Sequence, residues 1–105
     1  MSLSEITFFE RFEIDILSGQ KSITIRDESE KDYIPNSIVQ VSTFENGRWF
    51  CDLKILSVTP IQYDELLEFH AQQENMSLTE LKKVIQDIYP NTASLYVISY
   101  ELVRK

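Results

Sequence analysis

The sequence predicts a small α+β protein whose strands are mostly antiparallel. Helical spacing of apolar residues alternates with runs rich in β-branched residues, in the order helix, three strands, two helices and a last strand. An Asn-Gly pair at 46–47 separates two of the strands, which is a strong hairpin signal. With 105 residues, we expect one domain over 1–105, in which the sheet curls into a small open barrel flanked by helices.

The first helix is predicted to begin with a capping box at 7–10, where a threonine precedes a glutamate by three positions. Apolar side chains then recur every four positions: Phe8, Phe12 and Ile16. Gly19 stands where a left-handed glycine ends a helix. The order also allows a further short strand near 4–7, ahead of this helix.

Three strands follow, at 21–26, 37–44 and 49–58, with a polar loop at 27–36 before the second. In the third strand, alternate residues are apolar: Trp49, Cys51, Leu53 and Ile55. Cys51 therefore reads as a small core residue and not as a reactive thiol, because nothing nearby in sequence would lower its pKa.

The second half of the chain is predicted to hold two helices and a strand. The first helix covers 63–71 and starts between Thr59, which precedes a proline, and Asp64. A capping box at 77–80 opens the next helix, which runs to about Tyr89 and is ended by a proline. The last strand covers 95–103.

Charge and composition exclude several classes of function. The net charge is −7, with 10 Lys and Arg against 17 Asp and Glu, so attraction to nucleic acid or to an anionic membrane is not expected. A neutral small molecule meets no such barrier. The first fifteen residues lack the basic start and apolar run of a signal peptide, and no stretch has the ~20 apolar residues of a membrane span. We therefore expect a cytoplasmic protein.

Metal and nucleotide sites are also not expected. One cysteine and one histidine do not make a zinc site, and the chain's two glycines leave no phosphate-binding loop. We predict no metal and no cofactor. Spacing does not exclude a triad that uses His70, but this residue lies mid-helix, where an ordinary structural role is favoured.

The segment GQKSITIRDESE (19–30) holds the best candidates for chemistry: Lys21, Thr24 and Arg26. A lysine can activate a hydroxyl nucleophile if burial or a nearby cation lowers its pKa, and Arg26 is such a cation or a ligand for an anionic oxygen. The alternative is a strand with outward polar residues. In a regular strand, moreover, residues three apart face opposite sides, so Lys21 and Thr24 share a pocket only if the chain bends after Gly19.

Glu74 lies between the two later helices, a place that suits a carboxylate acting in proton transfer. The alternative is a solvated acid near a helix N-terminus.

Two long stretches, ITFFERFEIDILSGQKSITIRDESE and HAQQENMSLTELKKVIQDIYP, resemble the small bacterial YqfB-type proteins with an ASCH domain. The resemblance covers essentially the whole chain. It implies a small PUA-like β-barrel and the activity of an N4-acetylcytidine amidohydrolase, which releases cytidine and acetate. The family's lysine and threonine fall on Lys21 and Thr24 in KSITIRD, and its glutamate falls on Glu74 in QENM.

The resemblance also implies the role of each residue. Neutral Lys21 takes the proton of Thr24, whose oxygen attacks the acetyl carbonyl to form an acyl-enzyme, and protonated Glu74 donates to the departing amine. Arg26 is a candidate for substrate binding or for holding the oxyanion. The sequence leaves open which aromatic residue stacks on the base, and it leaves the oligomeric state undetermined. The main alternative is a non-catalytic PUA-like module that binds modified RNA or nucleosides.

Overall fold

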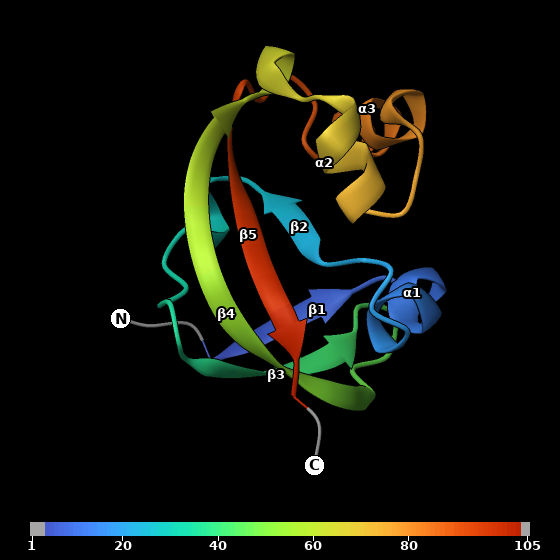
Figure 1. The fold of residues 1–105 in the computed structure, drawn as a ribbon, viewed down its shortest axis with the longest axis vertical. Helices are drawn as coiled ribbons and strands as arrows, with labels where there is room; N and C mark the ends of the chain where they lie inside the picture. Colours follow the sequence, from blue (N-terminus) through green and yellow to red (C-terminus); the bar gives the residue numbers. More distant parts are fainter. Residues whose placement is uncertain (1–3, 104–105) are drawn as a thin grey trace.

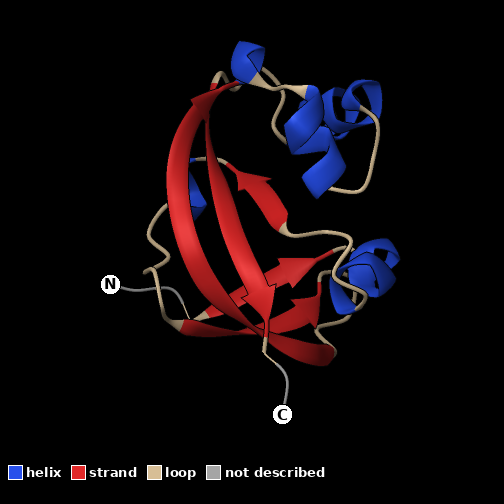
Figure 2. Cartoon of the chain, viewed as in Figure 1, coloured by secondary structure: helices blue, strands red, loops and turns tan. Residues whose placement is uncertain are grey.

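The computed structural model describes residues 4–103. In chain order, the elements are β1 (Glu5–Phe8), α1 (Glu13–Leu17), β2 (Ile23–Arg26), β3 (Ile38–Thr43), β4 (Trp49–Gln62), α2 (Glu68–Gln73), α3 (Leu78–Ile88) and β5 (Ser94–Leu102). Short 3-10 turns lie at Glu10–Phe12, Glu28–Glu30 and Tyr63–Glu65. Figures 1 and 2 show α1, α2 and α3 on the same side of the long strands β4 and β5.

The strands form one mixed sheet in the order β1-β3-β4-β5-β2. The pairing of β1 with β3 is parallel, and the other pairs are antiparallel. This confirms the predicted α+β class with mostly antiparallel strands. The long strands β4 and β5 bend along their length (Figure 1), but the sheet does not close, because β1 and β2 are its two edges. The barrel is therefore an open one.

The start of the chain differs from the predicted helix. Residues 5–8 form β1, in which Ile6 and Phe8 are buried while their neighbours are exposed, so the pattern has a period of two. The capping box at 7–10 does not form. Instead, the backbone N–H of Glu10 donates to the carboxylate of Glu45 at 2.9 Å, a partner distant in sequence. The helical pattern holds only from the 3-10 turn onward, and the further short strand expected near 4–7 is confirmed.

The hairpin between β3 and β4 forms as predicted, with Gly47 at φ +70°. A register shift between Val41 and Ser42 breaks the expected alternation at the start of β4. Trp49 is consequently 54% exposed, whereas Cys51, Leu53 and Ile55 are buried. The prediction of Cys51 as a core residue is confirmed.

Of the two predicted limits for the helix start, Thr59 was wrong, because β4 continues to Gln62, and Asp64 lies in the 3-10 turn Tyr63–Glu65. Pro60 is tolerated there because β3 pairs only with Trp49–Lys54 of β4, which leaves the far half bonded to β5 alone. Proline has no backbone N–H, and a strand that is paired on one side only can accommodate this loss.

The helix predicted over 63–71 is interrupted. A 3-10 turn ends at Glu65, Leu66 and Leu67 are extended, and α2 begins at Glu68. His70 lies in the first turn of α2, and its Nδ1 accepts the backbone N–H of Leu67 at 3.0 Å. The imidazole thus satisfies one of the free donors at the helix start, which is a structural role.

The later elements match their predictions closely. Ser77 caps α3, and its hydroxyl accepts the N–H of Glu80 at 3.1 Å while the Glu80 carboxylate accepts the N–H of Ser77. The last strand, β5, pairs with β4 and β2.

Buried apolar residues form two clusters. One lies among β1, α1 and β3–β5 and includes Phe8, Val41 and Tyr100. The other joins β2 to α2 and α3 and includes Ile25 and Leu81. None of the helices in the described range is long and apolar enough to cross a membrane.

Candidate active site

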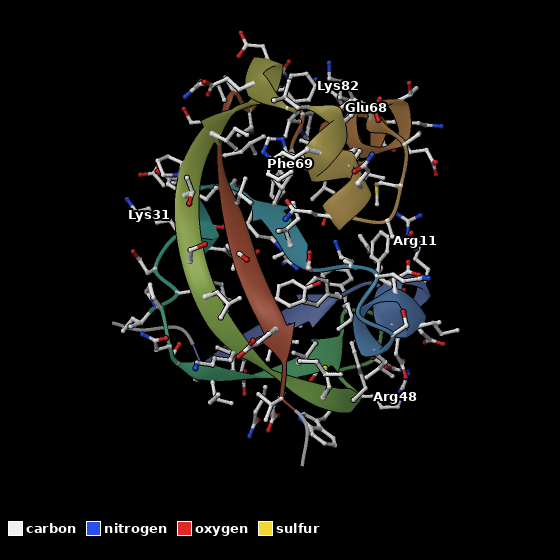
Figure 3. The ribbon with its side chains drawn as sticks, viewed as in Figure 1. Arg11, Lys31, Arg48, Glu68, Phe69 and Lys82 are labelled. Atoms are coloured by element: carbon white, nitrogen blue, oxygen red, sulfur yellow. The ribbon has the colours of Figure 1, made fainter. Side chains whose placement is uncertain are left out.

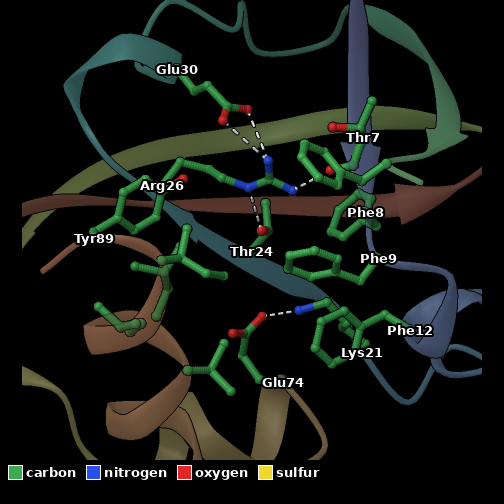
Figure 4. Close-up of a pocket in the computed structure, with 15 residues that line it drawn as sticks. Thr7, Phe8, Phe9, Phe12, Lys21, Thr24, Arg26, Glu30, Glu74 and Tyr89 are labelled. Carbon is green, nitrogen blue, oxygen red and sulfur yellow. Dashed lines mark hydrogen bonds and ion pairs between the residues drawn. The ribbon is translucent and has the colours of Figure 1, made fainter. Parts of the chain in front are cut away.

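A pocket of about 200 Å³ lies between the two apolar clusters. Its walls are largely aromatic and aliphatic: Phe8, Phe9, Phe12 and Phe44 on one side, and Ile25, Val84, Ile85, Ile88 and Tyr89 on the other. Its polar lining is provided by Thr7, Lys21, Thr24, Arg26, Glu30 and Glu74. Figure 4 shows the polar side chains directed toward one another between these walls.

Lys21 enters the pocket because the chain turns just before β2. Gly19 has φ +82°, and the backbone N–H of Lys21 donates to the carbonyl of Asp15 at 3.0 Å. The strand itself starts only at Ile23, so Lys21 is outside it. The alternation of a regular strand therefore does not apply, and Lys21 and Thr24 line the same pocket, as the predicted bend requires.

The Lys21 ammonium group is enclosed, with only 3% of the residue exposed. Its Nζ donates to the carbonyl of Ile23 at 3.0 Å and to the carboxylate of Glu74. Burial lowers the pKa of Lys21; contact with Glu74 opposes this shift, and the charge of Arg26 reinforces it. A lysine of this kind is suited to act as a base.

Glu74 comes from the C-terminal end of α2, and it is buried and not solvated. The next residue, Asn75, has φ +58°, a left-handed conformation that asparagine adopts readily at helix ends. Two bonds hold this end against the approach to β2: the Ser22 N–H donates to the Gln73 carbonyl at 2.7 Å, and the Asn75 side chain donates to Gln20 at 3.2 Å. Residues 53 positions apart are thereby placed in contact.

Thr24 and Arg26 lie on the same face of β2, as their spacing of two predicts. Thr24 is 4% exposed, and its Oγ1 accepts a hydrogen bond from Arg26 Nε at 2.8 Å. Within residues 4–103, no hydrogen bond joins Lys21 Nζ to Thr24 Oγ1.

Sequence reasoning missed most of the apolar wall and one acid. Phe8, Phe9 and Phe12 were assigned to a helix core, yet they line the pocket, and the Lys21 ammonium lies 5.1 Å from the centre of the Phe12 ring. Glu30 was placed in a polar loop. It lies in a 3-10 turn and forms an ion pair with Arg26, and only its charge and its closeness in sequence could have signalled this.

No cluster of three or more His, Cys, Asp and Glu side chains suited to a metal ion occurs in the described part of the chain. The polar groups that line the pocket are a lysine, two threonine hydroxyls, an arginine and two carboxylates. Together they can perform nucleophilic attack and proton transfer.

A scan against models of known protein families gives no match. Curated relatives, however, align over nearly the whole chain. The N(4)-acetylcytidine amidohydrolase of Vibrio atlanticus is 69% identical over 98 residues, covering 93% of this chain and 94% of the relative. The protein of the same name from Shewanella oneidensis is 56% identical, covering 98% of this chain and 99% of the relative.

The chain belongs to the N(4)-acetylcytidine amidohydrolase family. The resemblance found in the sequence is thus confirmed. Between this chain and the Vibrio vulnificus strain YJ016 member, 65% of residues are identical, over 95% of this chain and 96% of the relative.

Solved structures support the fold of this family member. An ASCH domain from Lactobacillus crispatus superposes with a TM-score of 0.78 at 19% identity, covering 96% of this chain and 79% of that one. ASCH from Zymomonas mobilis gives 0.73 at 12% identity, covering 95% and 69%. At these identities the likeness concerns the fold alone, and it confirms the expected ASCH fold.

Proposed function

We propose that this chain hydrolyses the acetyl amide of N4-acetylcytidine, with Lys21, Thr24 and Glu74 as its catalytic residues. The observation that carries the proposal is the burial of these three side chains in one pocket of a chain whose relatives bear that name. A buried hydroxyl next to a buried lysine–carboxylate pair has no evident structural need. Burying these polar groups lowers the stability of the fold relative to apolar residues at the same positions.

The pair is suited to supply both a base and an acid. A lysine and a carboxyl group in direct contact can share their proton as ammonium and carboxylate, or as amine and carboxylic acid. Burial lowers the pKa of Lys21, which favours the second form. One proton transfer within the pair therefore produces the two species that the reaction requires.

In the acylation step, the amine of Lys21 takes the proton of Thr24, and Oγ1 bonds to the acetyl carbon. The bond from that carbon to N4 then breaks, and Glu74 gives its proton to N4. Cytidine leaves and the acetyl group stays on Thr24 as an ester. After this step Lys21 is an ammonium ion and Glu74 a carboxylate, so the two side chains form an ion pair.

Deacylation reverses these proton transfers. A water oxygen bonds to the acetyl carbon while the water proton passes to Glu74. Lys21 returns its proton to Oγ1 as the ester bond breaks. Acetic acid is released and ionises, and both residues regain the form with which the cycle began.

The pocket walls suit an acylated base. A volume of about 200 Å³ lies below the ~300–1,000 Å³ of sites for drug-sized ligands, so a base with its acetyl group fits better than a longer segment. Phe9 and Phe44 meet edge to face at 5.3 Å and are candidates for stacking on the base. The charge of −7 also favours a neutral nucleoside over a polyanion.

The test measures, by chromatography, the release of cytidine from N4-acetylcytidine. Thr24→Val keeps the shape and removes the hydroxyl, so activity should disappear, whereas Thr24→Ser keeps the hydroxyl and should retain measurable turnover. Lys21→Met and Glu74→Gln should each lower kcat about 10²–10⁴-fold. Quenched samples should carry an acetyl group on Thr24 by mass spectrometry.

Two results would contradict the proposal. Near-normal rates for Thr24→Val would show that the reaction proceeds by direct attack of water and not through an acyl-enzyme. No turnover by the unchanged chain, together with binding of a modified RNA that weakens steeply with salt, would favour the alternative of a non-catalytic binding module.

A further inference from the structure

Arg26 is engaged by the protein at each of its three guanidinium nitrogens. Nε donates to Thr24 Oγ1 at 2.8 Å, and one terminal nitrogen donates to the Glu30 carboxylate at 3.0 and 3.2 Å. The other terminal nitrogen donates to the Thr7 carbonyl at 2.7 Å. The guanidinium carbon also lies 4.8 Å from the centre of the Phe8 ring. Its charge and geometry are therefore satisfied before any substrate binds.

The bond to Thr7 crosses the opening of the sheet. Thr7 belongs to β1 and Arg26 to β2, the two edges that do not pair. Figure 4 shows the guanidinium between Glu30 and the β1 strand, with Thr24 directly beneath it. The guanidinium plane is fixed from both edges, so Nε has one available direction, toward Thr24.

This contact restricts the Thr24 hydroxyl. A hydroxyl has one proton to donate and two lone pairs, and a guanidinium has donors only. One lone pair is therefore occupied by Arg26, and the hydroxyl proton must point elsewhere, which leaves it available to the lysine. When the proton departs, the charge that grows on Oγ1 is already hydrogen-bonded to a cation, and such charge-assisted bonds are the strong ones.

We propose that Arg26 is a positioning residue that orients the Thr24 hydroxyl and stabilises its ionised oxygen, and that it is not primarily a contact for the substrate. This inference rests on the proposed function, in which Thr24 is the nucleophile. It replaces the sequence prediction of Arg26 as a substrate ligand by a role that acts through another residue.

The two roles differ in kinetics. Arg26→Lys keeps a positive charge but loses the fixed fork, so the bond to Thr24 should be lost while the fold is retained. We expect kcat to fall about 10- to 100-fold, the loss typical of one hydrogen bond to a charged group, with KM changed less than about twofold. A residue that binds substrate equally in ground and transition states would instead raise KM and leave kcat nearly unchanged.

A pH profile supplies a readout that a merely structural role does not move. Charged groups from three elements face Lys21: Glu74 from the end of α2, Arg26 from β2, and Asp15 from α1. Arg26 contributes to the lowering of the Lys21 pKa, so its removal should raise that pKa. Because the base must be unprotonated, activity is lost as pH falls, and in Arg26→Gln this acid limb should move to higher pH.

The matched control is Arg48→Lys. Arg48 also pairs with a glutamate, Glu13, but it lies on the surface away from the pocket, and its side chain points outward in Figure 3. Its kcat, KM and pH profile should equal those of the unchanged chain. Thermal unfolding of each variant verifies that it is folded.

If Arg26→Ala or Arg26→Gln is less stable, chemical rescue of kcat keeps the proposal testable. Millimolar guanidinium ion should restore part of kcat to Arg26→Ala and none to a variant that combines Arg26→Ala with Thr24→Val. A KM effect in Arg26→Lys with unchanged kcat, or kcat within twofold of normal, would overturn the role of Arg26 alone. Lack of turnover by the unchanged chain would overturn this proposal together with the proposed function.

Discussion

The buried Lys21 and Glu74 side chains should depend strongly on each other for stability, and a double-mutant cycle can measure this coupling. Both residues are at most 5% exposed. Replacing one partner leaves the other buried without the group that shares its proton and its hydrogen bond, and such a loss costs about 3–5 kcal/mol in enclosed sites when the remaining group is charged. Because this pair borders an open pocket, we expect about 2–4 kcal/mol for Lys21→Met or Glu74→Met alone. Either loss is a large fraction of the roughly 5–15 kcal/mol by which a typical domain is stable.

The double variant should be more stable than either single variant. With both polar side chains gone, the main remaining loss is the hydrogen bond to the Ile23 carbonyl, which accepts from Lys21 Nζ at 3.0 Å. An unpaired acceptor of this kind costs about 1–3 kcal/mol, and better apolar packing against the nearby phenylalanines offsets part of it. We therefore expect the double variant to recover at least about 1–2 kcal/mol relative to the less stable single variant.

The assay is urea unfolding at pH 7, followed by far-UV circular dichroism. The surface pair of Arg48 and Glu13 serves as control, and its cycle should give a coupling of about 0–1 kcal/mol. Losses for Lys21→Met and Glu74→Met that simply add, or a double variant less stable than both, would refute the reasoning. In that case, the two side chains would behave as separately solvated groups.

Two further predictions concern the turn before β2 and the core. Gly19 and Gly47 both have positive φ, and a Cβ at either position would meet no atom within 4 Å, so alanine at either should cost about 1–2 kcal/mol through the backbone alone. Only Gly19→Ala should also lower kcat, because that turn directs Lys21; equal kcat in both variants would contradict this. Burial raises the pKa of Cys51 to about 11, so a thiol reagent at pH 8 should label it far more slowly in native protein than in urea, and equal rates would contradict its core position.

Local signals predicted the elements that depend on neighbours in sequence. The capping box at Ser77, the Asn-Gly turn and the end of α3 near Tyr89 are all formed by residues within a few positions of one another. They were recovered with bounds close to those observed. The sheet class followed from the same hairpin.

Long-range contacts decided the places where prediction failed. The apolar residues of the N-terminal segment fit both the spacing of a helix and the alternation of a strand. The parallel pairing of β1 with β3 stabilises the strand. Pro60 reads as a helix start, but pairing with β5 keeps it in β4. The break at Leu66 and Leu67 depends on a side-chain cap from His70, a residue that rarely serves so and gave no prior signal.

The candidate site shows the same division. Spacing placed Thr24 and Arg26 on one face of a strand, and Gly19 signalled a bend before Lys21. The burial of Glu74 was not predictable from its own neighbours, since it depends on the bond from Ser22 to the end of α2. Its place between two helices made Glu74 a candidate, but only the resemblance to relatives favoured it over the other acids among the chain's 17.

The open edge of the sheet explains why these residues meet where they do. Had β1 and β2 paired to close the barrel, their backbone groups would satisfy one another and side chains would fill the space between them. Instead, the carbonyl of Thr7 is satisfied by the Arg26 guanidinium across the opening. A side-chain link of this kind holds the two edges in place while keeping them far enough apart for a pocket. The same guanidinium then contacts Thr24, so the group that replaces barrel closure also fixes the hydroxyl. Architecture and proposed chemistry thus depend on one residue, which is why Arg26→Lys, with the fold retained, separates the two contributions better than any truncation.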